Sequence, residues 1–243
     1  MRHLLLALSM LLLAAGAAVA SERHCALPDH LRGAGEGLPR LAERLAGNEE
    51  LAVVAVGSTA SLPGGGSRLG RIATEAFLGA MARHFPGRRF AVSAVIDAKA
   101  TAPEVVETEF PALVIGRPAL VLWQTGGVDA MEHVDLHSFD EALRLGIAMI
   151  QQAGGDVMLL TPLFSVRSLA VTNMREYLNY IGFAAGSVGV PLLDRHAALR
   201  HWIDQGVVNP ADDAARRSDA EFVHGCLGKL MADMVHAAVK NAR

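Results

Sequence analysis

The sequence predicts an α/β fold, a three-layer α/β/α sandwich with a five-stranded parallel sheet. Short apolar runs alternate with segments of helical period through most of the chain. The runs are continuously apolar and do not alternate with polar residues, which is typical of parallel strands covered on both faces by helices. The length agrees, since about 220 residues after an N-terminal leader fit a single α/β domain with a sizeable core.

Each element follows from its local pattern. The first helical segment is charged and amphipathic, over 34–47, and precedes the first strand, over 51–57. Strands read as apolar runs and helices as segments of period 3.6. Further strands are expected at 89–96, 119–123, 156–161 and 190–193, and further helices at 68–84, 102–115, 138–153, 172–187, 195–205 and 218–240.

The last helix has a clear start signal. Ser218 and Glu221 have the spacing of a capping box just before an apolar run. In such a box each side chain satisfies a backbone amide that the first helical turn leaves without a partner. The helix is therefore expected to begin at Ser218, which places His224 almost two turns inside it.

Residues 1–20 resemble an export signal. Arg2 supplies a positive start, an apolar run follows, and Ala18 and Ala20 mark a small-residue cleavage site. The apolar run is too short for a membrane span, which needs roughly 20 residues. We therefore expect a signal peptide followed by one domain over 21–243, with no stable membrane span after cleavage. The predicted location is the periplasm of a bacterium or the outside of the cell.

The composition indicates which classes of partner to expect and in which compartment the protein is located. The formal net charge is −3, and no basic run is present, so a nucleic-acid partner is not expected. Only Lys99, Lys229 and Lys240 are lysines among the 22 basic residues, a bias typical of a bacterial gene rich in G and C. The two cysteines, Cys25 and Cys226, are a plausible disulfide in an oxidising compartment, the alternative being two buried thiols.

The first strand ends in glycine and hydroxyl residues. Gly57, Ser58 and Thr59 follow the apolar run directly, and Ser61 adds a third hydroxyl. In a parallel sheet the carboxyl ends of the strands are where ligands and catalytic groups usually lie. The turn is thus a candidate for a nucleophile.

The chain resembles the SGNH/GDSL hydrolase superfamily, in particular its exported bacterial esterases and acylhydrolases, which have a flavodoxin-like fold. The resemblance implies a serine nucleophile in the first block, a glycine and an asparagine that form the oxyanion hole, and an Asp-x-x-His that activates the serine. It covers nearly all of the mature sequence. It rests on the turn at Gly57 and Ser58, on the segment 120–126 with its Trp-Gln-x-Gly pattern, on the segment 199–202, and on the cysteine pair.

Three of the family's positions carry unsuitable residues. The nucleophile position falls on Thr59, whose β-branch is stiff and adds a methyl where substrate must approach. The glycine of the second block falls in 96–98, where side chains would obstruct the oxyanion. In the third block Gly126 matches, but the asparagine position falls on Val128, which has no donor, and neighbouring Asp129 is an acceptor.

The fourth block allows two alignments. If His224 is the catalytic histidine, Glu221 lies three residues before it and imitates the family's Asp-x-x-His. If Cys226 is aligned with the family's cysteine, the histidine position falls on Ser218 and no general base is present. We favour the second alignment, because the family's histidine lies in a loop and the capping box places His224 inside a helix.

These observations lead to competing hypotheses. The favoured one is a pseudoenzyme, impaired or inactive, that uses Gly57, Gly126, Val128 and Asp129 to bind an acylated polysaccharide, peptidoglycan, a lipid or a protein partner. The alternative is an active esterase or acyltransferase in which Ser58 or Thr59 is the nucleophile, His224 the base and Glu221 its orienting carboxylate. A third, weaker hypothesis is a phosphate site in the glycine-rich loop 63–68. We expect no cofactor, and no metal site because no histidine has the spacing of a metal ligand.

Overall fold

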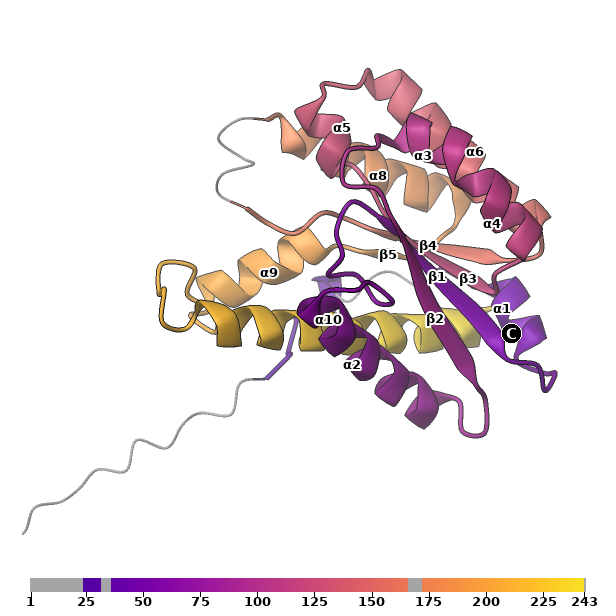
Figure 1. The fold of residues 1–243 in the computed structure, drawn as a ribbon, viewed down its shortest axis with the longest axis horizontal. Helices are drawn as coiled ribbons and strands as arrows, with labels where there is room; N and C mark the ends of the chain where they lie inside the picture. Colours follow the sequence, from indigo (N-terminus) through magenta and orange to yellow (C-terminus); the bar gives the residue numbers. More distant parts are fainter. Residues whose placement is uncertain (1–23, 32–35, 166–171, 243) are drawn as a thin grey trace, which may run out of the picture.

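The computed structural model describes residues 24–31, 36–165 and 172–242. The proposed signal peptide, residues 1–20, lies outside the described residues. The chain forms a five-stranded sheet in the order β2-β1-β3-β4-β5 with every pair parallel, which confirms the predicted fold class (Figure 1). The strands are β1 Leu51–Gly57, β2 Phe90–Ile96, β3 Leu120–Gln124, β4 Asp156–Leu160 and β5 Leu192–Leu193.

Helices cover both faces of the sheet, and each face has its own hydrophobic core (Figure 1). The first core lies under α1 Pro39–Arg44, α2 Arg68–His84, α9 Arg195–Asp204 and α10 Arg216–Asn241. The second lies under α3 Ala102–Thr108, α4 Phe110–Gly116, α6 Leu136–Gln152 and α8 Met174–Val188. Two short elements complete the described part, η1 Asp29–Leu31 and α5 Gly127–Met131.

Several predicted boundaries were wrong for local reasons. The segment 102–115 is two helices because Pro111, at the start of α4, has no amide to continue the ladder of α3. Helix α5 was not predicted, since its five residues are too few to show a helical period. Helix α6 starts earlier than expected because Asp135 caps it, accepting bonds from the amides of His137 and Ser138.

The start of the last helix also differs from the prediction. Helix α10 begins at Arg216, and Ser218 lies within its first turn, where its hydroxyl donates to the carbonyl of Ala215. Glu221 binds Arg68 of α2, with 2.8 Å between Oε1 and Nε. The capping box was therefore a wrong prediction, because a tertiary partner competes for the glutamate. The inference that His224 lies inside the helix is confirmed.

The N-terminal segment is fixed to the end of the chain. Cys25 and Cys226 form a disulfide across 201 residues of sequence, as predicted. The indole Nε1 of Trp202 also donates to the carbonyl of Ala26 at 3.2 Å. The segment before η1 is thus held by both α9 and α10.

Candidate functional site

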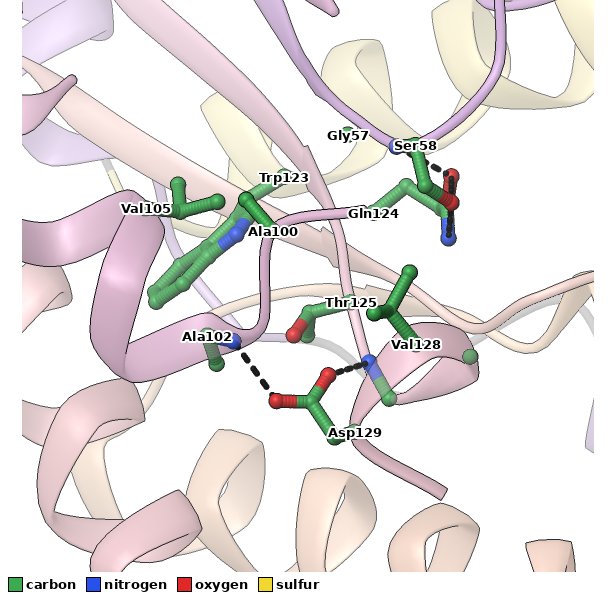
Figure 2. A pocket seen from close by; sticks show the side chains of 12 residues that line it. Gly57, Ser58, Ala100, Ala102, Val105, Trp123, Gln124, Thr125, Val128 and Asp129 are labelled. Atoms are coloured by element: carbon green, nitrogen blue, oxygen red, sulfur yellow. Dashed lines mark hydrogen bonds between the residues drawn. The ribbon is translucent and has the colours of Figure 1, made fainter. Parts of the chain in front are cut away.

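Five of the predicted site residues gather at the carboxyl edge of β1 and β3. Gly57 ends β1 and Ser58 follows it, while α5 carries Val128 and Asp129 (Figure 2). Gly126 directly precedes α5. This proximity follows from the parallel pairing of β1 with β3, which brings their carboxyl ends to the same side. The sequence therefore predicted correctly that these residues lie close together.

Ser58 is bound to a side chain that the sequence argument passed over. Its amide nitrogen lies 3.2 Å from Oε1 of Gln124, and its hydroxyl lies 3.3 Å from both Oε1 and Nε2 of that amide (Figure 2). Gly57 permits this approach, since a Cβ there would lie 2.8 Å from Oε1 of Gln124 and 2.9 Å from Leu62. A primary amide does not take up a proton near neutral pH, so Gln124 cannot activate the hydroxyl as a base.

Thr59 is also engaged locally. Its Oγ1 lies 3.0 Å from the hydroxyl of Ser61 and accepts a bond from the Ser61 amide at 3.3 Å. Such contacts are the usual role of hydroxyls at a turn that leaves a strand. None of the hydrogen bonds described at Ser58, Thr59 or Ser61 goes to an imidazole.

The turn after β2 uses its backbone amides internally. The amide of Asp97 donates to the carbonyl of Gly57 at 3.1 Å. The carboxylate of Asp97 in turn accepts bonds from the amides of Lys99 at 2.9 Å and Ala100 at 3.1 Å. The amides of Asp97, Lys99 and Ala100 are therefore already paired within the protein.

Asp129 is a structural residue of the site. It is 2% exposed, and its two oxygens accept bonds from the amides of Ala102 at 2.6 Å and Gly126 at 3.0 Å (Figure 2). Burial raises the pKa of this carboxyl, and the backbone hydrogen bonds oppose the rise. Asp129 thus ties the start of α3 to the turn that opens α5. Beside it, the side chain of Val128 is 5% exposed and supplies no donor.

The cavity between Ser58, Gln124 and Asp129 is small. The cavity that they line, together with Trp123 and Val105, has a volume of about 10 Å³. That is the space needed for about one water molecule.

His224 and Glu221 do not form a pair. Nδ1 of His224 lies 2.8 Å from the carbonyl oxygen of Ala220, one turn earlier in α10, while Glu221 binds Arg68. A carbonyl oxygen only accepts, so Nδ1 carries the proton and the neutral ring presents a bare Nε2. Within the described residues, Nε2 has no hydrogen-bond partner.

His224 should make the protein less stable in acid. Burial lowers its pKa below the ordinary value of 6.5, and the positive charge of Arg195 lowers it further. Between the lowered pKa and 6.5 the unfolded chain binds more protons, so stability falls as the pH falls through this window. We expect His224→Phe to show a smaller loss of stability than the wild type between about pH 7.5 and 5 in urea unfolding.

Some acid sensitivity should remain in that variant, because burial also lowers the pKa of His196 and His236. His137→Phe is the control, since this histidine is exposed on α6. If stability fell equally steeply with pH in the wild type and in His224→Phe, the lowered pKa of His224 would not be the cause of the acid sensitivity.

Three amides of the glycine-rich loop 63–68 are paired within the protein. The amide of Gly64 donates to Thr74 Oγ1 at 2.7 Å, that of Gly65 to the carbonyl of Leu62, and that of Ser67 to the carbonyl of Ala60. Ser67 itself caps α2 by accepting from the Gly70 amide. These paired amides give the phosphate hypothesis no support.

The described residues hold neither a metal-binding cluster nor a membrane-spanning helix. No group of three or more histidine, cysteine, aspartate or glutamate side chains in them is arranged to hold a metal ion. Likewise, no helix in that part of the chain is long and apolar enough to cross a membrane.

Sequence reasoning missed two buried polar residues near the strand ends. Gln124 is 5% exposed and Arg195, at the start of α9, is 3% exposed. Nε of Arg195 donates to the carbonyl of Thr161 at 2.7 Å, and burial lowers the pKa of the guanidinium to about 9. The sequence held a signal for Gln124, because this polar side chain ends an otherwise apolar strand. It held no signal for the burial of Arg195, which lies in a polar stretch.

The fold, an all-parallel five-stranded sheet between two layers of helices, is that of the SGNH/GDSL hydrolases. A family model described as the non-GDSL lipase-like family matches residues 24–241, so the chain belongs to that family. The resemblance to the SGNH/GDSL hydrolase superfamily is thereby confirmed. No curated protein matches the chain.

Solved structures share the fold at low sequence identity. The acetylxylan esterase Axe2 from Geobacillus stearothermophilus is 15% identical, with a TM-score of 0.59 over 76% of this chain and 94% of the esterase. TesA is 16% identical, with a TM-score of 0.52 over 76% of this chain and 97% of its own. LAE5, an α/β hydrolase from the metagenome of Lake Arreo in Spain, is 16% identical, with a TM-score of 0.56 over 81% of this chain and 99% of its own.

Proposed function

We propose that this chain is an exported protein of the SGNH/GDSL hydrolase superfamily that has lost ester hydrolysis and acts by binding. The ligand classes that suit this family are an acylated polysaccharide, peptidoglycan, a lipid or a protein partner. The observation that carries the proposal is the state of Ser58, whose hydroxyl is bound to the Gln124 amide beside a cavity of about 10 Å³.

Three parts of a hydrolytic site are compromised together. The hydroxyls lie against an amide or against one another, and the amides of Asp97, Lys99 and Ala100 after β2 are paired. Valine stands where the family has an oxyanion donor, and losing one such donor costs roughly 100- to 1000-fold in rate. These losses occur in separate strands and loops, so a single local rearrangement would not restore the site.

Export is supported by two independent features. Residues 1–20 have the pattern of a signal peptide, and the chain holds a disulfide between Cys25 and Cys226. Structural disulfides persist in oxidising compartments and are rare in the cytosol. The proposed location is the bacterial periplasm or the medium.

We expect no ester hydrolysis that depends on this site. The purified chain from residue 21 onward is assayed with p-nitrophenyl acetate and butyrate, beside Ser58→Ala, Thr59→Ala and His224→Ala. The expected rate equals the uncatalysed background and does not change in any variant, whereas a working hydrolase exceeds the background by at least about a millionfold. The acetylxylan esterase Axe2 serves as the positive control.

The second candidate is an active esterase or acyltransferase in which Ser58 or Thr59 is the nucleophile. The bare Nε2 of His224 favours it, because a neutral imidazole nitrogen without a partner is the form that a general base requires. Hydrolysis that any one of the three substitutions abolishes would establish this candidate and overturn the binding proposal.

A further inference from the structure

A cavity lies at the end of the sheet opposite Ser58, where the strands begin and where α2 and α10 end. Figure 1 shows these two helices running side by side toward that end. The cavity volume is about 340 Å³, within the roughly 300–1,000 Å³ typical of sites for small ligands. Part of its wall is apolar and consists of Leu45, Phe85, Pro86 and Val239. A small apolar group can pack against this part.

The rest of the wall includes two cations that no carboxylate neutralises within the described part of the chain. Arg88 is half-buried, and its Nη2 donates to the carbonyls of Arg44 at 3.3 Å and Glu49 at 3.0 Å, which fixes the guanidinium in place. The carboxylate of Glu49 binds Arg44 instead, at 2.9 Å. Lys240, near the end of α10, is exposed, and its ammonium has no partner among the described residues.

A pair of stacked histidines lies beside these cations. The ring of His236, on α10, stacks on that of His84, on α2, with 4.3 Å between the ring centroids, and both line the cavity. Nε2 of His84 lies 2.6 Å from Oδ1 of Asp233, so this carboxylate already has a partner. Burial lowers the pKa of His236, the charges of His84 and Lys240 lower it further, and Asp233 opposes them. An anion in the cavity favours the protonated form of His236.

The two helix ends oppose an anion, but more weakly than the cations attract it. The C-terminus of one helix carries the equivalent of about half a negative charge, so the ends of α2 and α10 together amount to about one. Arg88 and Lys240 supply two full positive charges, and protonated His236 adds a third. The charges at the cavity therefore favour an anionic ligand.

We propose that this cavity binds a small soluble phosphate monoester, with the phosphate at Arg88 and Lys240 and its apolar group against Phe85. A phosphate carries about −1.5 to −2 charges at pH 7 and has three acceptor oxygens, which match the guanidinium, the ammonium and the imidazole of His236. The inference goes beyond the proposed function, since this site lies at the other end of the sheet from Ser58. It stands whether or not the chain hydrolyses esters.

Isothermal titration calorimetry of the disulfide-bonded chain tests the proposal with four probes at about pH 7 and about 0.1 M salt. Phenyl phosphate has both the phosphate and the apolar group, whereas benzoate has a weaker anion, inorganic phosphate has no ring and phenol has no charge. We expect phenyl phosphate to bind at least about tenfold more tightly than each of the other three. Any of the three binding as tightly as phenyl phosphate would overturn the proposal.

Variants of the two cations test their roles. Arg88→Gln and Lys240→Gln should each weaken phenyl phosphate roughly tenfold. Lys229→Gln is the matched control, because it removes the same charge from an exposed position of α10 about 16 Å earlier along the helix, beyond the screening length of about 10 Å at 0.1 M salt. It should bind as the wild type does. If Arg88→Gln does not fold, Lys240→Gln still decides, and wild-type affinity in that variant would refute the site.

Benzenesulfonate tests the histidine, because its charge stays constant between about pH 7.5 and 5.5. Its affinity should rise at least about threefold as the pH falls through this window, since protonated His236 attracts an anion. In His236→Phe, which keeps a ring to stack on His84, the rise should be smaller. An affinity that does not change with pH in the wild type would contradict a place for His236 in the site.

Vesicles distinguish a soluble ester from a lipid headgroup with the same phosphate chemistry. The chain should remain in the supernatant when phosphatidylcholine vesicles that contain phosphatidic acid are sedimented. Sedimentation with these vesicles, but not with phosphatidylcholine alone, would assign the phosphate to a lipid and overturn the soluble ligand proposed here.

Discussion

Removing the disulfide should lower the free energy of unfolding by up to about 5 kcal/mol in the double variant Cys25→Ala/Cys226→Ala. The bond closes a loop of 201 residues, nearly the whole domain, so its loss releases a large conformational entropy in the unfolded chain. Whole domains are stable by only about 5–15 kcal/mol. The loss is therefore a large share of the total, and for a domain of this size it lowers the Tm by roughly 10–20 °C. Urea and thermal unfolding measure it.

Reduction provides the control for that experiment. The wild type with its disulfide reduced should unfold at about the same urea concentration as the double variant, because both lack the cross-link. Dithiothreitol should leave the double variant unchanged. A double variant as stable as the oxidised wild type would show that the contacts of 24–27, including the bond from Trp202 to Ala26, hold the N-terminal segment by themselves.

Asp129→Ala should be the second most damaging change, lowering the free energy of unfolding by about 2–5 kcal/mol. The substitution leaves the buried amides of Ala102 and Gly126 without an acceptor, and each unsatisfied donor costs about 1–3 kcal/mol. The relief of a buried carboxylate, whose pKa burial already raises, offsets a part of this. Urea unfolding near neutral pH provides the measurement.

Asp129→Asn is the matched variant. It keeps one acceptor oxygen but turns an amide NH₂ toward the other backbone donor, so we expect a loss of stability between those of Ala and the wild type. As a further comparison, Asp135→Ala removes an exposed helix cap on α6 and should cost about 1 kcal/mol. If Asp129→Ala lowered the free energy of unfolding no more than Asp135→Ala does, Asp129 would not have the structural role described here.

The fold was predictable because its signals are local and repeated. Continuous apolar runs such as 51–57 identify buried parallel strands, and the segment 68–84 was predicted with the bounds that α2 has. Where prediction failed, a single residue or a distant contact decided the outcome. Pro111 divides one expected helix into two, and Arg68 takes the glutamate that a capping box would need.

The candidate site was predictable in position but not in its chemical state. Parallel pairing guarantees that residues after β1 and β3 meet, so Gly57, Gly126 and Asp129 could be grouped from the sequence. Which atoms they bind depends on side chains that approach from other elements. The bond between Ser58 and Gln124 spans 66 residues and has no signature in either segment alone.

The sequence by itself determined the fold class and the superfamily resemblance and made a disulfide between Cys25 and Cys226 plausible, because each depends on residue types at particular positions along the chain. Only the tertiary structure decided that the Ser58 hydroxyl lies against an amide, that Asp129 ties two loops together, and that the buried Nε2 of His224 has no hydrogen-bond partner among the described residues. The physical reason is that hydrogen-bond partners and cavities arise from atoms brought together by packing, across distances in sequence that no local pattern encodes.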